Sequence, residues 1–138
     1  MSLFILDTDT LSLHERGHPV LSPTIRAHQD ELAITVISVE EQLSGWYSLL
    51  RRATQPPDVA AAYQRLASAV QLYSGMRILS FTELAIARFE QLVTLKLNIG
   101  KQDLRIAAIT LEQGSVLVSR NLRDFRRVPN LIVEDWSV

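Results

Sequence analysis

The chain has 138 residues, no cysteine and a formal net charge of −1, and 47% of its residues are hydrophobic. This length and composition indicate one compact globular domain over 1–138 and exclude a disordered or disulfide-rich chain. The missing cysteines also exclude thiolate metal sites and a cysteine nucleophile, and the near-neutral charge gives no global signature of nucleic-acid binding.

Hydrophobic periodicity divides the first part of the chain into short apolar strands and helices. A strand is expected over 3–6, LFIL, with a short helix after Asp9 and a second helix over 20–28. The apolar, β-branched run LAITVI at 32–37 predicts a strand that is buried on both faces.

Ser38 follows this run and is expected to be the N-cap of a long helix over 39–52. The second half of the chain repeats the alternation of helices with short strands. Further helices are expected over 58–74, 82–97 and 101–113, and further strands over 77–80, 116–119 and 131–134. This alternation predicts a three-layer α/β/α sandwich with a central, mostly parallel sheet of four or five strands.

The sequence gives no sign of a membrane or secretory segment. No apolar run approaches the roughly 18 residues that a membrane helix needs. The N-terminus lacks both a basic start and a small-residue cleavage site. We therefore expect a cytoplasmic protein that has no contact with a membrane.

Acidic and amide side chains occupy equivalent positions around the predicted sheet. In a doubly wound sheet, the carboxyl ends of the strands and the amino ends of the helices meet at one edge, where ligands usually bind. The residues expected at this edge are Asp7, Asp9, Glu41, Asp103, Asn121 and Asp124. The topology therefore predicts an acidic pocket there.

Each of these acids also has a structural interpretation of its own. Asp7 and Asp9 can cap the turn and the helix after the first strand. Glu41 has the capping-box spacing from the expected N-cap, Asp103 complements a helix dipole, and Asp124 suits an Asx turn. Gathered together, however, carboxylates repel and raise one another's pKa values. A hard cation such as Mg²⁺ or Mn²⁺, bound by oxygen ligands, would offset this repulsion.

The segment SRNLRDFRR at 119–127 holds four arginines against one acid and begins at the same edge. It is either a solvated surface or a contact for a nucleic-acid backbone, because guanidinium groups bind phosphate in a bidentate manner. A bound cation beside it can activate water and offset charge on a phosphodiester. His14 and His18 lie far from this segment in sequence, and we expect them at the surface.

Four blocks of the chain together resemble the PIN-domain ribonucleases, and most of all the VapC toxins of bacterial toxin–antitoxin pairs. These blocks are FILDTDTLS, ISVEEQLSGW, DLRIAAITLEQGSVLVSRNLRDF and LIVEDW. A lone LDT would be a weak signal, whereas four blocks in order over about 3–136 are specific.

The resemblance implies a metal-dependent endoribonuclease that acts as the toxin of a type II pair, with structured RNA such as transfer RNA as its substrate. It implies Mg²⁺ or Mn²⁺ binding by Asp7 and Asp103, with Glu41 and Asp124 completing the catalytic acidic set. It also implies a homodimer and a cognate antitoxin that blocks the pocket. The residues expected to contact or orient substrate are Ser119, Arg120, Asn121 and Arg123.

The chain departs from the family pattern at four positions. One is Gln42, which stands before Leu43 and puts Glu41 one residue off the usual spacing to that leucine, although Glu41 still lies four residues before Gly45. Asp9 stands where the family usually has Asn, which adds a charge, and Ser119 stands where it usually has Thr. Asn121 and Asp124 are both candidates for the fourth acidic position, and only Asp124 carries a charge. The neutral Asn121 leaves open a catalytically inactive interaction module with the same fold. A phosphoacceptor receiver domain is disfavoured, because RILSFTE at 77–83 has no Asp and no lysine follows Lys101.

Overall fold

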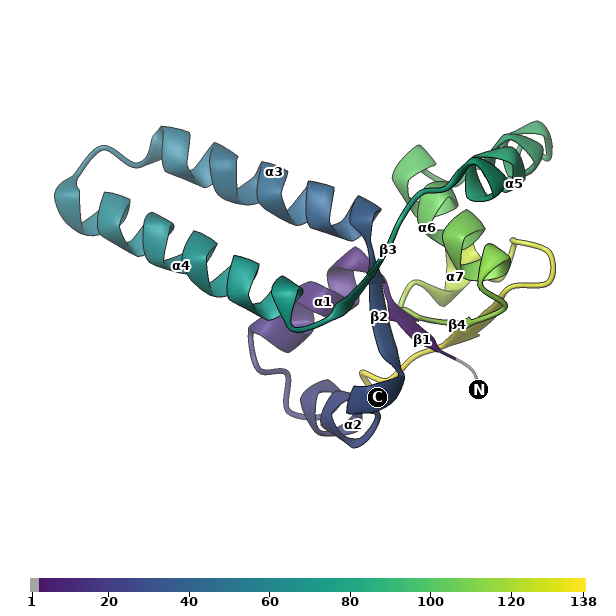
Figure 1. The fold of residues 1–138 in the computed structure, drawn as a ribbon, viewed down its shortest axis with the longest axis horizontal. Helices are drawn as coiled ribbons and strands as arrows, with labels where there is room; N and C mark the ends of the chain where they lie inside the picture. The colour runs from purple at the N-terminus through teal and green to yellow at the C-terminus, as the bar shows by residue number, and fades with distance from the viewer. Residues whose placement is uncertain (1–2) are drawn as a thin grey trace.

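The computed structural model describes residues 3–138 as a central parallel sheet flanked by helices (Figure 1). Its strands are β1 (Phe4–Leu6), β2 (Leu32–Thr35), β3 (Arg77–Leu79), β4 (Val116–Val118) and β5 (Ile132–Glu134). Its helices are α1 (Thr8–Glu15), α2 (Leu21–Ala27), α3 (Val36–Arg52), α4 (Pro56–Ser74), α5 (Glu83–Thr94), α6 (Lys101–Glu112) and α7 (Leu122–Phe125). The strand order is β3–β2–β1–β4–β5, and all neighbouring strands are parallel. The predicted parallel sheet is confirmed, with five strands.

The two faces of the sheet belong to two separate hydrophobic cores. Alternate residues of a strand point to opposite faces. Ile5 and Leu117 therefore pack with α5, α6 and α7, whereas Leu6 and Val118 pack with α1, α2 and α4. Because helices cover both faces, the expected three-layer α/β/α sandwich is confirmed.

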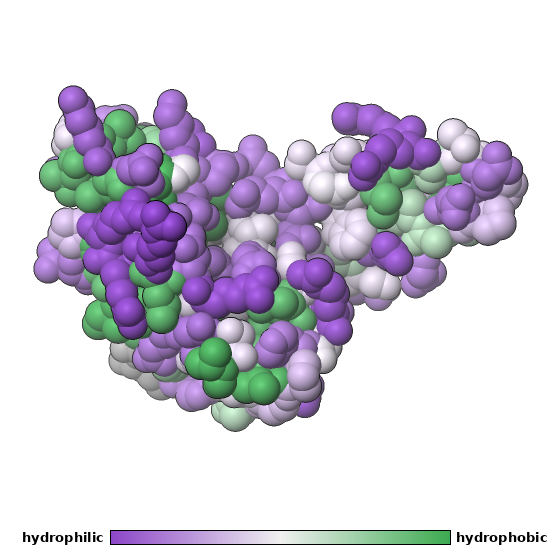
Figure 2. Space-filling view, turned by 180° about the vertical axis from the view of Figure 1, so that it is seen from behind, coloured by the Kyte–Doolittle hydropathy of each residue, from purple (hydrophilic) through white to green (hydrophobic). Residues whose placement is uncertain are grey.

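Helices α3 and α4 form a long hairpin that extends away from the sheet, on the left of Figure 1 and on the right of Figure 2. The buried residues of α3, Ile37 and Ser38, both lie in its first turn, and α4 is the main neighbour of this helix, with α1 and α6 also in contact with it. Hydrophilic residues cover much of the face that Figure 2 shows. Within residues 3–138, no helix is both long and apolar enough to cross a membrane.

The start of α3 differs from the sequence prediction. The strand expected over 32–37 ends at Thr35, which is the N-cap: its Oγ1 accepts a hydrogen bond from the backbone N–H of Ser38 at 3.2 Å. The prediction of Ser38 as the N-cap was therefore wrong. The helix begins at Val36, and Ile37 in its first turn packs into the core. Packing of this apolar residue overrides its preference for a strand.

Two histidines that were expected to be simple surface residues connect α1 to α2. Nδ1 of His14 lies 3.1 Å from the hydroxyl oxygen of Ser22, and burial, followed by the charge of Arg26, lowers the pKa of His14. Nδ1 of His18 accepts a hydrogen bond from the backbone N–H of Leu21 at 3.1 Å. Both histidines are partly exposed, so the expected surface position is not contradicted, but each also has a local structural partner.

Candidate active site

An open pocket of about 610 Å³ lies at the carboxyl edge of the sheet. It is lined by residues from the start of α1, from α3, from α6 and from the segment after β4. These residues are Asp7, Thr8, Asp9, Ser12, Glu41, Asp103, Arg120 and Asn121. The structure thus brings together three of the four predicted catalytic acids, from three separate elements.

Asp7 lies directly after β1 and is only 5% exposed. Its carboxylate caps α1 by accepting a hydrogen bond from the backbone N–H of Thr10 at 2.8 Å, so the cap of this helix is Asp7 and not Asp9. Burial raises the pKa of Asp7, and hydrogen bonds from the side chains of Ser119 and Thr10 only partly offset this effect. A cation beside Asp7 would favour its charged form.

Glu41 is held by hydroxyl groups that join α1 to α3. Thr8 donates a hydrogen bond from Oγ1 to Oε1 of Glu41 at 2.7 Å. Because Thr8 has only one hydroxyl proton, the contact of 2.9 Å between its Oγ1 and Ser38 Oγ must be donated by Ser38. Nε2 of Gln42 also donates to Ser12 Oγ at 2.6 Å. Glu41 lies in the second turn of α3, beyond the capping-box position that the sequence suggested.

Asp103 lies in the first turn of α6, on the opposite side of the pocket from α1. Burial, followed by the negative charges of Asp7, Glu41 and Asp124, raises the pKa of Asp103 to about 6. Asp103 is therefore close enough to three other carboxylates to be repelled by each of them. The expected gathering of acids at this edge is a feature of the structure; their catalytic role stays a prediction.

Asn121 and Asp124 bind one another in a short helix that the sequence analysis missed. Asn121 is the N-cap of α7: its Oδ1 accepts from the backbone N–H of Asp124 at 3.4 Å, and its Nδ2 donates to the Asp124 carboxylate at 3.1 Å. Arg127 also pairs with Asp124 at 3.1 Å. Asn121 lines the pocket. Asp124 lies outside the lining, but its negative charge helps to raise the pKa of Asp103.

The four predicted substrate contacts differ in their placement. Arg120 lines the pocket and forms an ion pair with Asp9, with Nε 2.6 Å from Oδ2. Ser119 is 1% exposed, and its Oγ accepts from the backbone N–H of Asn121 at 3.0 Å, so it supports the pocket wall. Arg123 is exposed and lies outside the pocket lining.

Thr8 and Ser12 are pocket residues that the sequence analysis did not single out. The signal available for them was the run of hydroxyl residues in DTDTLS, which surrounds both acids of that segment. Hydroxyl groups spaced along one face of a helix suit contacts with a neighbouring carboxylate or amide, as both residues make here.

Sequence comparison relates short segments of the chain to ribonucleases. No family model matches the chain. A segment of 41 residues is 45% identical to ribonuclease VapC2 of Rickettsia felis, and one of 38 residues is 50% identical to ribonuclease VapC2 of Haemophilus influenzae. The two segments make up 30% and 28% of this chain, and they span only 31% and 29% of the curated relatives' lengths.

Solved structures match the chain over almost its whole length. A chain of DNA-bound VapBC from Salmonella typhimurium has a TM-score of 0.82 over 99% of both chains, at 25% identity. The chain resembles the VapC proteins. VapBC2 from Rickettsia felis, bound to a DNA fragment from its promoter, gives a TM-score of 0.78 at 23% identity and covers 97% of this chain and 98% of that one. The resemblance of the four sequence blocks to VapC is thereby confirmed.

The acidic pocket has the donor chemistry of a hard cation site. Its acidic groups supply only oxygen ligands, which suit Mg²⁺ and Mn²⁺, and no histidine lines it. Among the residues that the structure describes, 3–138, no three acidic or imidazole side chains lie in an arrangement that could hold one ion. The chemistry of the donors nevertheless fits a cation.

Proposed function

We propose that the chain is an endoribonuclease of the VapC type, which hydrolyses RNA phosphodiester bonds with Mg²⁺ or Mn²⁺ at the acidic pocket. The observation that supports this proposal most strongly is the convergence of Asp7, Glu41 and Asp103 on one cavity that also contains Arg120. Acidic groups suit a cation, and a guanidinium group beside them suits the phosphate that a nuclease must hold.

Asp7 and Asp103 would hold the cation, and Glu41 and Asp124 would complete the negative field around it. When bound, the cation supplies an activated water and offsets charge on the phosphodiester. Thr8 occupies only Oε1 of Glu41, and within residues 3–138 Oε2 has no hydrogen-bond partner, so this oxygen can orient a water.

The remaining pocket residues would hold the substrate. Arg120 can contact the phosphate through its guanidinium group, because that group already lies at the pocket wall. The hydroxyl of Ser119 acts on Asp7 rather than on RNA, since its hydrogen bond favours the ionised form of that carboxylate. Asn121 can contact substrate or water from its position in the lining, and Arg123 would reach only RNA outside the pocket.

We also propose that this nuclease is a toxin whose cognate antitoxin blocks the pocket, and that it acts as a cytoplasmic homodimer of single-domain chains. One structural neighbour is described as a member of the VapBC family of toxin–antitoxin systems from Mycobacterium tuberculosis, with a TM-score of 0.59. The proposed substrate class is structured RNA, with transfer RNA as the first to examine.

The proposal is tested by incubating total RNA with the purified protein and Mg²⁺ or Mn²⁺, with EDTA, and with the Asp7→Asn variant. We expect discrete cuts that need the cation and are lost in the variant. Asp30→Asn is the matched control, because Asp30 is an exposed acid on the turn before β2. We expect this control to cut RNA as the unchanged protein does.

A specific observation favours one second candidate, a catalytically inactive interaction module. Asn121 is neutral and is already engaged as the cap of α7, so the fourth acidic position of the family has no charge at this residue. A folded protein that leaves RNA uncut with both cations would contradict the nuclease proposal and support this alternative.

A further inference from the structure

A series of connected hollows runs from the acidic pocket along the α3–α4 hairpin. Ser12 and Glu41 line both the acidic pocket and a neighbouring hollow of about 380 Å³ between α1 and α3. Leu49 and Arg52 line both that hollow and a third one, of about 430 Å³, between α3 and α4. Neighbouring hollows share lining residues, so together they are described as one groove, the hairpin groove. It begins at the acidic pocket.

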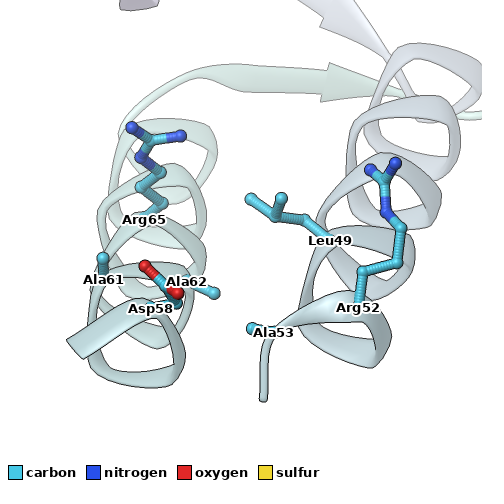
Figure 3. A pocket seen from close by; sticks show the side chains of 7 residues that line it. All are labelled: Leu49, Arg52, Ala53, Asp58, Ala61, Ala62 and Arg65. Carbon is cyan, nitrogen blue, oxygen red and sulfur yellow. The ribbon is translucent and has the colours of Figure 1, made fainter. Parts of the chain in front are cut away.

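Three arginines line the hairpin groove, two from α3 and α4 and one from the C-cap of α1. Figure 3 shows Arg52 of α3 and Arg65 of α4 extending in the same direction from facing helices, with Leu49 between them. Arg16, at the end of α1, lines the hollow beside α3 and also a hollow of about 580 Å³ that it shares with Arg65. Small side chains also line the groove near the arginines, namely Ala53, Ala61 and Ala62.

Within residues 3–138, the guanidinium groups of Arg52 and Arg65 are available to a ligand, whereas Nε of Arg16 donates a hydrogen bond to the carbonyl oxygen of Ser12 at 3.3 Å. Among residues 3–138, Arg16, Arg52 and Arg65 take part in none of the ion pairs. Besides Glu41 at its start, two acids also line the groove, Glu15 and Asp58. Asp58 forms no ion pair with either neighbouring arginine. Burial raises the pKa of Glu15, so its carboxylate is less readily ionised and is a weaker counter-charge for the arginines.

We propose that the hairpin groove binds the sugar–phosphate backbone of the RNA substrate on one side of the cut, with Arg52 and Arg65 as phosphate contacts and Arg16 between them and the acidic pocket. This inference rests on the proposed nuclease function. Arg52 follows Glu41 by 11 positions on the same helix, a distance of roughly 16 Å along its axis. The contact therefore lies outside the reacting phosphodiester.

The chemistry of the groove suits a single strand of RNA. Guanidinium groups bind phosphate oxygens in a bidentate manner and carry a charge at every physiological pH. Trp46 lies between the arginines and the acids, lining both hollows that Arg16 lines. One side of its ring packs against the core, so only the part that lines the hollows is open to a base. An aromatic surface among arginines is typical of sites for single-stranded nucleic acid.

The test measures RNA binding separately from RNA cleavage. A fluorescent single-stranded RNA oligonucleotide is titrated with the Asp7→Asn protein at several salt concentrations, with and without the additional pair Arg52→Gln and Arg65→Gln. Two lost phosphate contacts should reduce the slope of log affinity against log salt by about 1.4. We expect affinity at low salt to fall at least about fivefold.

Arg51→Gln with Arg77→Gln is the matched control. Both arginines are exposed, Arg51 is the neighbour of Arg52 on α3, and neither lines any hollow of the groove. This control removes the same charge from the protein, so it separates local contacts from net charge. We expect its slope to stay within the error of the parent protein. Circular dichroism and thermal unfolding establish that all variants are folded.

Cleavage then separates the two proposals. If the protein cuts RNA with a cation and the Arg52→Gln, Arg65→Gln pair raises KM more than it lowers kcat, the groove and the nuclease are both supported. If the protein cuts RNA but affinity and salt slope do not change in that pair, the groove proposal alone is overturned. If no RNA is cut although the slope depends on these arginines, the nuclease proposal fails and RNA binding stands.

Discussion

The guanidinium group of Arg120 binds the carboxylate of Asp9 at the acidic pocket, with Nε 2.6 Å and Nη2 3.3 Å from its two oxygens. Asp9 follows β1 and Arg120 follows β4, and these strands are neighbours in the sheet. Water and salt screen this exposed pair, so it adds little to stability. The pair matters for the site instead, because Arg120, the proposed phosphate contact, is already bound to the carboxylate of Asp9.

Replacing Asp9 by Asn should release Arg120 for RNA. The Asp9→Asn change removes both the competing carboxylate and one negative charge from the pocket, so we expect KM for RNA to fall while the melting temperature stays almost unchanged. Steady-state cleavage at two salt concentrations measures this effect. Arg120→Gln is the opposite control and should raise KM. A higher KM in Asp9→Asn would instead show that Asp9 orients Arg120 or helps to bind the cation.

Asp7 should have separable roles in chemistry and in folding. Both Asp7→Asn and Asp7→Ala should abolish cleavage, because neither supplies a carboxylate. Asn caps a helix about as well as Asp, whereas Ala does not, so only Asp7→Ala should lower the free energy of unfolding, by about 1 kcal/mol. Urea denaturation measures the difference. Equal loss of stability in both variants would mean that the side chain of Asp7 does not act as the cap.

The charge of Asp103 should destabilise the fold at neutral pH. Its pKa is about 6 in the folded protein against an ordinary value of 3.8. The stability that the protonated carboxyl contributes is therefore complete below about pH 4 and is lost as the pH rises through about 6. Asp103→Asn removes the carboxylate charge, so in EDTA at pH 7.5 this variant should be more stable than the unchanged protein by about 1–2 kcal/mol. The gain is smaller than the whole pKa shift would give, because solvent screens the partly exposed Asp103.

Urea denaturation at pH 4 and at pH 7.5 tests this dependence on Asp103. The gain from Asp103→Asn should disappear at pH 4, where both side chains are neutral. Asp30→Asn, a change of an exposed acid outside the pocket, should give no gain at either pH. An equal gain from Asp103→Asn at both pH values would show that packing, rather than charge, causes it.

Gly45 in the middle of α3 should be replaceable by Ala with a gain in stability. A Cβ atom built there meets no atom within 4 Å, and Gly in a helix costs about 0.5–1 kcal/mol relative to Ala. Gly45→Ala should therefore raise the free energy of unfolding by that amount in urea denaturation. Loss of stability in Gly45→Ala would contradict the open surroundings of that residue.

Gly114, just after α6, has a φ of +59°, so Gly114→Ala should be destabilising by about 1 kcal/mol.

The strands and the acidic edge could be predicted because they depend on local pattern and on topology. LFIL and VLVS are apolar runs between turn or polar residues, and their expected ranges differ from β1 and β4 by a single residue. Once the strands are parallel, their carboxyl ends must meet at one edge. The approach of Asp7, Glu41 and Asp103 to one another follows from that topology and needs no knowledge of side-chain packing.

Other features depend on contacts that a local pattern does not contain. Thr35 and Ser38 are both good N-caps, and the packing of Ile37 into the core decides between them. Helix α7 has four residues, too few for a hydrophobic period to appear. The Asp9–Arg120 pair joins residues 111 positions apart, so only the finished fold brings them together.

The α3–α4 hairpin is joined to the rest of the protein mainly at one end, so a rotation at that end displaces the opposite end most (Figure 1). A helix of 17 residues is roughly 25 Å long. A rotation of about 10° at the base of α3 would therefore move the hairpin tip by about 4 Å, several times more than it would move Glu41. The tip carrying Arg52 could thus follow substrates of different width while the acids near the base remain almost stationary.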